Sequence, residues 1–292
     1  MKWIQTHALT ARQQEQIRSL QETCRRAEPF GHSVFLSGEL NHFGEMDCFF
    51  LGYEGQALAA VLTLFQPDAR EAEVTAFVRP DLRRQGRFTA LFAAARAELE
   101  RFGVSSVLFF HEPVCASGGE VLKRFPVERH HTEYLMEYDR TAAPAVPVLP
   151  LELEPATREL LPRLAELSAA AFGDAAADSR EKVERFFTAP AVSGYAARLD
   201  GRVAGHLFCN TEGGEAYLCD FCVEPALQGR GIGRSILALV LARVRRETEL
   251  PIRLEVDAVN DRALGLYTAC GFRETARCDY CLLYTSPSPR DA

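Results

Sequence analysis

Residues 221–235 read FCVEPALQGRGIGRS: a short apolar stretch, a proline, and then a loop with three glycines. Apolar residues follow from Ile236 to Val244 at helical spacing, so the loop opens a helix. Gly231 and Gly233 allow a backbone to pass close to a ligand, and the free amides of a first helical turn attract an anion. The stretch therefore predicts a diphosphate-binding turn, for which a tight turn without a ligand is the alternative interpretation.

Strands are expected on both sides of this turn. Apolar runs predict two of them before it, at Val203–Cys209 and Ala216–Val223. After it, helical spacing predicts a helix over Ser235–Glu247, and alternation predicts a strand at Ile252–Val256. Strand, glycine turn, helix and strand in this order indicate an α/β fold with a mixed sheet.

The same order of elements occurs earlier in the chain, which indicates an internal repeat. Arg83–Phe88 corresponds to Gln228–Gly233 at an offset of 145 residues. Leu122 corresponds to Tyr267 at the same offset. The hairpin turn Glu54-Gly55 corresponds to Asp200-Gly201 at an offset of 146 residues. An offset that slips by only one residue over this distance predicts two tandem copies of one domain.

The boundary between the copies is expected at residues 141–150, which contain three prolines and no charge and suit an extended linker. We therefore expect domains at 1–140 and 151–280. Residues 281–292 resemble a translated sequencing adapter and are set aside as an artefactual tail, so the native chain is expected to continue differently after Tyr280.

Composition excludes several classes of protein. The chain of 292 residues has a formal charge of -7. A net negative charge gives no general electrostatic attraction for the phosphate backbone of a nucleic acid, so we expect no nucleic acid partner. The N-terminus lacks the apolar core of a signal peptide, and the apolar run Ala57–Phe65 is too short to span a bilayer. A soluble cytoplasmic protein is predicted. The nine cysteines lack the spacing of a disulfide framework, and we expect reduced thiols. Cys219-x-x-Cys222 and Cys278-x-x-Cys281 together imitate a four-thiolate zinc pattern, but the pairs are 56 positions apart and Cys281 belongs to the suspected adapter, so we expect no bound metal.

A second motif follows the glycine turn. Residues 254–260 read LEVDAVN, and Leu266-Tyr267 and Gly271-Phe272 come after them. Together with residues 221–235, this pattern resembles the GNAT superfamily of N-acetyltransferases, with its Gln/Arg-x-x-Gly-x-Gly/Ala loop. The layout in two copies is similar to that of mycothiol synthase, a tandem-domain member of the superfamily. The resemblance implies two tandem GNAT-type domains, with the catalytic one at 151–280.

The resemblance also implies the chemistry. An acetyl group would pass from acetyl-CoA to a primary amine of a small molecule or peptide, with Tyr267 protonating the departing thiolate. The alternative for Tyr267 is an aromatic side chain that packs one helix face. Asn260 would lie beside the pantetheine arm or cap the helix that begins at Asp261. The residues expected to bind the cofactor are Phe221, Cys222, Val223, Gln228, Gly229, Arg230, Gly231, Ile232, Gly233, Arg234, Ser235 and Asn260.

The general base and the role of the first copy are less defined by the sequence. Asp220 and Glu224 stand near the right strand end, but a water relay could serve instead. In the first copy, Phe88 and Leu122 replace the small residue and the tyrosine, so that copy is expected to be degenerate, with a structural or substrate-shaping role. Gly86 leaves cofactor binding there open. The rival hypothesis for the whole chain is a non-catalytic acyl-CoA sensor or interaction module.

Overall fold

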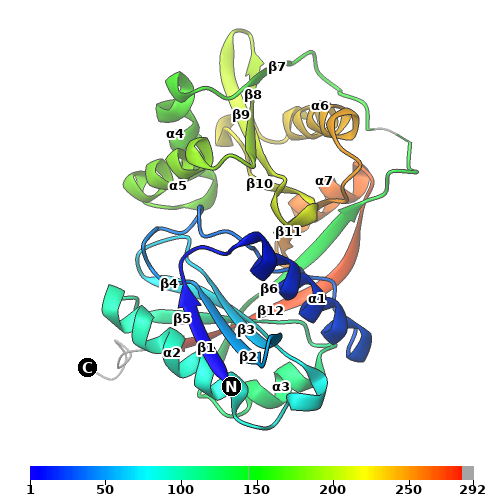
Figure 1. Ribbon diagram of the computed structural model, residues 1–292. Helices are drawn as coiled ribbons and strands as arrows, with labels where there is room; N and C mark the ends of the chain where they lie inside the picture. The colour runs from blue at the N-terminus through cyan, green and yellow to red at the C-terminus, as the bar shows by residue number, and fades with distance from the viewer. Residues whose placement is uncertain (144, 285–292) are drawn as a thin grey trace. The chain divides into compact units, whose positions relative to one another are not determined.

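The computed structural model describes residues 1–143 and 145–284 (Figure 1). Residues 285–292, most of the segment attributed to an adapter, lie outside the described residues. Within the described part of the chain, no helix is long and apolar enough to cross a membrane.

The chain divides into two compact units. Unit 1 comprises Met1–Glu133 together with the described residues from Ala276 onward, and unit 2 comprises Tyr134–Thr275. The described residues of the predicted linker, 141–143 and 145–150, belong to unit 2 in this division, and the predicted domains 1–140 and 151–280 remain a prediction.

Unit 1 is a sheet with the strand order β1-β2-β3-β4-β5-β12, in which β4 and β5 are parallel and the other neighbours antiparallel. Its elements are β1 (Lys2–Thr6), α1 (Ala11–Ala27), β2 (Phe49–Glu54), β3 (Ala57–Phe65), β4 (Glu71–Val78), the 3₁₀ helix η1 (Pro80–Leu82), α2 (Arg87–Phe102), β5 (Ser106–His111), α3 (Ala116–Leu122), the first part of β6 (Glu128–Tyr138) and most of β12 (Phe272–Tyr284).

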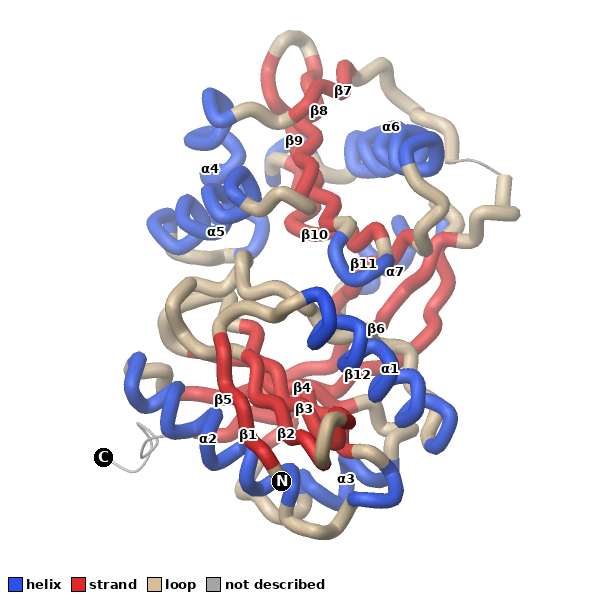
Figure 2. The backbone as a smooth tube through the Cα atoms, in the orientation of Figure 1, coloured by secondary structure: helices blue, strands red, loops and turns tan. Residues whose placement is uncertain are grey.

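Unit 2 is a sheet with the order β6-β11-β10-β9-β8-β7, in which β10 and β11 are parallel. Its elements are β7 (Glu152–Pro155), η2 (Arg158–Leu160), α4 (Leu161–Phe172), α5 (Ala176–Thr188), β8 (Val192–Leu199), β9 (Arg202–Asn210), η3 (Glu212–Gly214), β10 (Ala216–Val223), η4 (Pro225–Leu227), α6 (Ile232–Glu247), β11 (Ile252–Asp257) and α7 (Asp261–Ala269). Figure 2 shows α4 and α5 on one side of β8–β10 and α6 on the other.

The elements predicted around the glycine turn are confirmed. Strands β9, β10 and β11 occupy the predicted positions, and β10 has the predicted ends. Helix α6 begins at Ile232, three residues before the predicted start, because Gly231 in a left-handed conformation is its N-cap. Parallel and antiparallel neighbours in one sheet confirm the predicted mixed α/β fold.

The internal repeat is confirmed in detail. Helices α2 and α6 begin 145 residues apart, as do strands β4 and β10. Both helices have a left-handed glycine as N-cap, Gly86 with φ of 77° and Gly231 with φ of 84°. The two copies therefore share both the order of their elements and the backbone conformation of the turn.

The last strand of each copy crosses the boundary of the compact units. Strand β6 begins in unit 1, but Met136 and Tyr138 are buried in the core of unit 2. Strand β12 begins in unit 2, but Cys281 and Leu283 are buried in the core of unit 1. These buried apolar residues explain why the compact units differ from the halves of the sequence.

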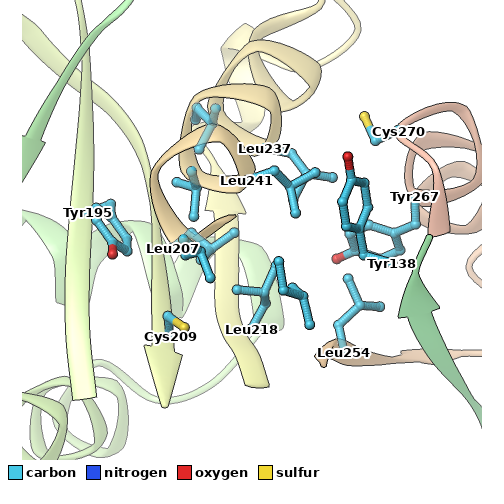
Figure 3. Close-up of a cluster of buried hydrophobic side chains, with 14 of the residues drawn as sticks. Tyr138, Tyr195, Leu207, Cys209, Leu218, Leu237, Leu241, Leu254, Tyr267 and Cys270 are labelled. Carbon is cyan, nitrogen blue, oxygen red and sulfur yellow. The ribbon is translucent and has the colours of Figure 1, made fainter. Parts of the chain in front are cut away.

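Helices cover both faces of the sheet in unit 2. One apolar cluster lies between the sheet and α6 and α7, and it includes Leu237, Leu241 and Tyr267 (Figure 3). A second cluster lies under α4 and α5, with Leu164 and Val183 at its centre. The glycine turn follows the end of β10 and leads into α6.

Candidate active site

The parallel strands β10 and β11 separate before the glycine turn. Their ladder contains only Ala216 with Ile252 and Tyr217 with Arg253, although both strands continue beyond these pairs. The backbone of β10 from Leu218 onward therefore faces a wedge between the strands. An extended ligand can pair with a free strand edge of this kind.

The wedge opens onto the turn that the sequence predicted to bind a diphosphate. Gln228 Nε2 donates a hydrogen bond to Val223 O at 3.1 Å and closes the turn. Gly229 and Gly231 have positive φ angles of 79° and 84°, which strongly favour glycine. No side chain caps α6, so the amides of its first turn are available to an anion.

The side chains of the turn divide into exposed and buried ones. Arg230 and Arg234 are exposed, where a cation can meet a phosphate group. Ile232 belongs to the core, so only its backbone can serve a ligand. A Cβ on Gly233 would make ordinary contacts with Leu266, with Cδ2 at 3.4 Å. The cofactor roles predicted for these residues remain predictions.

A linker segment lies against the turn, which the sequence did not indicate. The backbone amides of Val148 and Leu149 donate to Ser235 Oγ at 2.9 and 3.0 Å. A Cβ built on Gly231 would lie 2.6 Å from Val148 Cγ2. The buried Ser235 hydroxyl thus fixes the linker beside α6 instead of facing solvent.

Asp220 lies in a β-bulge at the centre of the wedge. The register of β10 against β9 shifts between Cys219 and Cys222, and Asp220 has a positive φ of 46°. Its carboxylate accepts hydrogen bonds from Ser168 Oγ at 2.9 Å and Lys182 Nζ at 3.0 Å. These two contacts connect the bulge to both α4 and α5.

His206 completes this buried cluster. Its Nε2 atom lies 2.8 Å from Asp220 Oδ2, and its Nδ1 atom lies 3.3 Å from Cys222 Sγ. Burial would raise the pKa of Asp220, but the hydrogen bond from His206 and the charge of Lys182 lower it to about 2. Burial raises the pKa of the Cys222 thiol, which stays protonated. A carboxylate with so low a pKa is a weak proton acceptor at neutral pH.

The second predicted base, Glu224, is also bound in an ion pair. Its Oε2 atom lies 2.6 Å from Arg163 Nη2, and Arg163 also donates to Val203 O. The pair joins α4 to the end of β10. Because the Glu224 side chain is about one third exposed, with 37% of its surface accessible, its carboxylate still reaches solvent.

Tyr267 on α7 belongs to the apolar cluster in Figure 3. Only 9% of the residue is exposed. Its ring centroid lies 6.3 Å from that of Phe221 and 5.9 Å from that of Phe272. Burial raises the pKa of Tyr267, so the phenol is protonated at neutral pH and can act as a proton donor.

Two residues at the start of α7 bear on the site. Asn260 accepts a hydrogen bond from Ala263 N at 3.1 Å and is the N-cap of α7, so the capping interpretation is confirmed. Arg262 Nη1 donates to Gln228 Oε1 at 2.8 Å and brings a cation to the glycine turn. The sequence analysis missed Arg262, whose position at the second residue of the helix after Asn260 was the available signal.

The corresponding turn in unit 1 borders a cavity of about 330 Å³. Gly86 and Leu122, the counterparts of Gly231 and Tyr267, both line it. Phe88, where unit 2 has Gly233, lines it too and stacks on Phe92 with centroids 5.7 Å apart. Among the described residues of both units, no group of three or more His, Cys, Asp or Glu is arranged to hold a metal ion.

Comparison with known families gives a match in the second half of the chain, and comparison with known proteins gives partial matches. Residues 161–272 match the family described as acetyltransferase (GNAT) family. The chain is 32% identical over 99 residues to mycothiol acetyltransferase of Clavibacter sepedonicus, which covers 34% of this chain and 33% of that protein. It is 34% identical over 82 residues to ribosomal protein bS18 alanine N-acetyltransferase of Salmonella typhimurium, which covers 28% and 55%. The chain thus spans about a third to about half of the length of these relatives.

Solved structures match the whole chain. The tandem GNAT protein from the clavulanic acid biosynthesis pathway has a TM-score of 0.74 and 18% identity, over 98% of this chain and 99% of its own. The GCN5-related N-acetyltransferase from Sphaerobacter thermophilus has a TM-score of 0.72 and 17% identity, over 98% and 96%. At this identity the likeness shows the fold, and it confirms the predicted tandem arrangement.

Proposed function

We propose that unit 2 transfers an acetyl group from acetyl-CoA to a primary amine, because residues 161–272 match the acetyltransferase (GNAT) family. The observation that carries the proposal is the wedge between β10 and β11, which leads to the uncapped first turn of α6. The edge of β10 can pair with an extended cosubstrate, and the free amides of the first turn of α6 can bind a diphosphate at one end of it.

Different residues along the wedge would bind different parts of acetyl-CoA. The amides at the start of α6 would bind the pyrophosphate, with Arg262 beside them at Gly229. The edge of β10 at Phe221–Val223 would pair with the pantetheine arm. The thioester would then lie near Tyr267, a proposal supported by the Phe221 and Tyr267 rings being neighbours.

The reaction then needs one proton donor and one proton acceptor. The neutral amine attacks the thioester carbonyl carbon, and the C–S bond breaks as the tetrahedral intermediate collapses. The Tyr267 phenol donates its proton to the departing sulfur, and the amine nitrogen loses a proton to water or to a base reached through water. Asp220 contributes by fixing the bulge of β10, since its carboxylate is fully engaged.

The acceptor is an amine, and its identity follows from neither the family nor the fold. The relatives named above are named for different substrates, mycothiol and an alanine of ribosomal protein bS18, so neither substrate transfers to this chain. Thiol release from acetyl-CoA, measured across a panel of peptides, polyamines and amino sugars, tests the proposal. Release that depends on one class of amine supports it. Tight binding of acetyl-CoA with no release on any amine would favour the non-catalytic sensor instead.

A further inference from the structure

Residues 147–150, here called the strap, lie beside the first turns of α6 in unit 2 (Figure 2). Their sequence is PVLP. Because proline has no backbone N–H, the strap has only two amide donors, those of Val148 and Leu149. Both donate to Ser235 Oγ, at 2.9 and 3.0 Å. Every amide donor of the strap is therefore bound to one side chain of α6.

Ser235 depends on the strap in the same way. It is the fourth residue of α6, and none of its surface is exposed. A buried hydroxyl is costly unless it has hydrogen-bond partners, and the two strap amides are such partners. Without the hydroxyl the two amides would lose their acceptor, so removal of one oxygen atom should release the strap.

The strap contacts Gly231, the N-cap of α6, from outside the helix. Gly231 has a φ of 84°, and a glycine has more conformational freedom than any other residue. The Cγ2 atom of Val148 lies 2.6 Å from the position that a Cβ on Gly231 would take, so the valine fills the space on that side of the glycine. The strap therefore limits the conformations of the turn to which the diphosphate is assigned.

Unit 1 has the same turn without this arrangement. The offset of 145 residues places Ala90 at the position of Ser235, and Ala90 is exposed. The backbones agree, since Ala90 N donates to Gly86 O and Ser235 N donates to Gly231 O, each at 3.0 Å. No described atom lies within 4 Å of a Cβ built on Gly86. The serine and the strap are thus specific to the copy that carries Tyr267.

Val148 also presents a surface that a ligand could cover. Although it contacts Gly231, 52% of the residue is exposed. A diphosphate ligand on the first turn of α6 would cover part of this apolar surface, which is favourable in water. Ligand binding and the seating of the strap would then favour each other, because a coupling between two binding events acts equally in both directions.

We propose that Ser235 is a positioning residue for the diphosphate of acetyl-CoA and acts by holding the strap against Gly231. This inference rests on the function proposed for unit 2, and it gives the linker a part in cosubstrate binding. The strap keeps the turn in its binding conformation before acetyl-CoA arrives, so less conformational freedom is lost on binding. Ser235 itself does not contact the ligand.

Hydrogen–deuterium exchange of the full-length protein at increasing acetyl-CoA concentrations tests this inference. Peptides that cover the strap and the first turn of α6 report on unit 2, regardless of any ligand in unit 1. In the wild type, acetyl-CoA should slow exchange in both peptides. Ser235→Ala should speed exchange of the strap about tenfold without ligand, and it should raise about tenfold the acetyl-CoA concentration that half-protects the turn.

Ser179→Ala is the matched control. Ser179 is likewise the fourth residue of its helix, α5, and none of its surface is exposed. Within the described part of the chain, however, its hydroxyl has no hydrogen-bond partner. This variant should exchange as the wild type does in both peptides, with and without acetyl-CoA.

Val148→Ala gives a second test and replaces Ser235→Ala if that variant melts early. It keeps both strap amides and shortens only the side chain that contacts Gly231. The strap should exchange near the wild-type rate, while the half-protecting concentration of acetyl-CoA should rise about threefold. An unchanged concentration in this variant would show that the contact with Gly231 does not serve binding, which would overturn the proposal.

Two results in Ser235→Ala would also overturn the proposal. In one, the strap exchanges rapidly but the half-protecting concentration of acetyl-CoA is that of the wild type. In the other, the strap exchanges at the wild-type rate, so the hydroxyl does not hold it. Failure of saturating acetyl-CoA to protect the α6 turn in the wild type would instead contradict the function proposed for unit 2. The wild-type titration therefore distinguishes the two failures.

Discussion

The Nε2 atom of His206 lies 2.8 Å from Oδ2 of Asp220, and both side chains are buried at the bulge of β10. Ser168 and Lys182 bind the other carboxylate oxygen. Three donors on one side chain fix the backbone at a position where φ is positive and strained. We infer that Asp220 acts through this backbone, by holding the strand edge at Phe221–Val223 in place.

The first prediction concerns stability. Asp220→Asn removes one partner of a buried ion pair and should lower the free energy of unfolding by about 3 kcal/mol at pH 7. Because the pKa of Asp220 in the folded protein is about 2, below its ordinary value, the contribution of the carboxylate is present above about pH 4. It is lost as the pH falls from about 4 toward 2. The difference between wild type and variant should therefore shrink over this interval.

Urea unfolding at several pH values between 3 and 7 measures this difference. Asp200→Asn is the control, because Asp200 is exposed in the turn between β8 and β9. It should leave the pH dependence of stability unchanged. A gap between wild type and Asp220→Asn that stays constant down to pH 3 would contradict the depressed pKa.

The second prediction separates a structural carboxylate from a general base. If Asp220 only positions the bulge, Asp220→Asn should lower kcat/KM without moving the acidic limb of its pH profile. If Asp220 were the general base, its titration would produce the acidic limb of the wild-type profile, and that limb would be absent from the variant. The measurement is kcat/KM for acetyl-CoA between pH 5 and 9. Loss of the acidic limb in the variant would show that Asp220 is the general base.

The third prediction concerns the glycine turn. Gly231→Ala puts a side chain on a residue with φ of 84° and within 2.6 Å of Val148 Cγ2. It should destabilise unit 2 by about 2 kcal/mol and abolish the rise in melting temperature that acetyl-CoA produces. Gly265→Ala is the matched control, since nothing lies within 4 Å of a Cβ there. That change, inside α7, should stabilise the protein slightly.

Much of the fold follows from local patterns in the sequence. The ends of β10 are those that its apolar run predicts, and the offset of 145 residues places α2 and α6 correctly, since periodicity and turn residues act over short distances. The course of β6 and β12 could not be predicted in this way. Their apolar residues complete cores that are assembled from distant parts of the chain, which no local pattern encodes.

The candidate site was predictable to a similar extent. The glycine turn, its helix and the cap at Asn260 were visible as motifs. The cluster around Asp220 was not, because Ser168, Lys182 and His206 come from three separate elements. A lone histidine in an apolar strand and a lysine on a helix give no signal until tertiary structure brings them together.

The last prediction concerns Tyr267. Tyr267→Phe keeps the ring that packs beside Phe221 and Phe272 and removes only the hydroxyl. If the phenol protonates the departing thiolate, turnover should fall about 100-fold or more, while acetyl-CoA binding and stability change little. Steady-state kinetics and the thermal shift with acetyl-CoA measure the two effects separately. Near-normal turnover on the true acceptor would leave Tyr267 with a packing role alone.

Leu122→Met at the corresponding position of unit 1 is the control for this variant. It exchanges side chains of similar volume in the wall of the cavity, where no proton donor is lost, so it should leave turnover within about twofold. The two results together assign the chemical step to one unit. A large loss of turnover in Leu122→Met, with an unchanged melting temperature, would place the reaction in unit 1 and leave unit 2 as the binding domain.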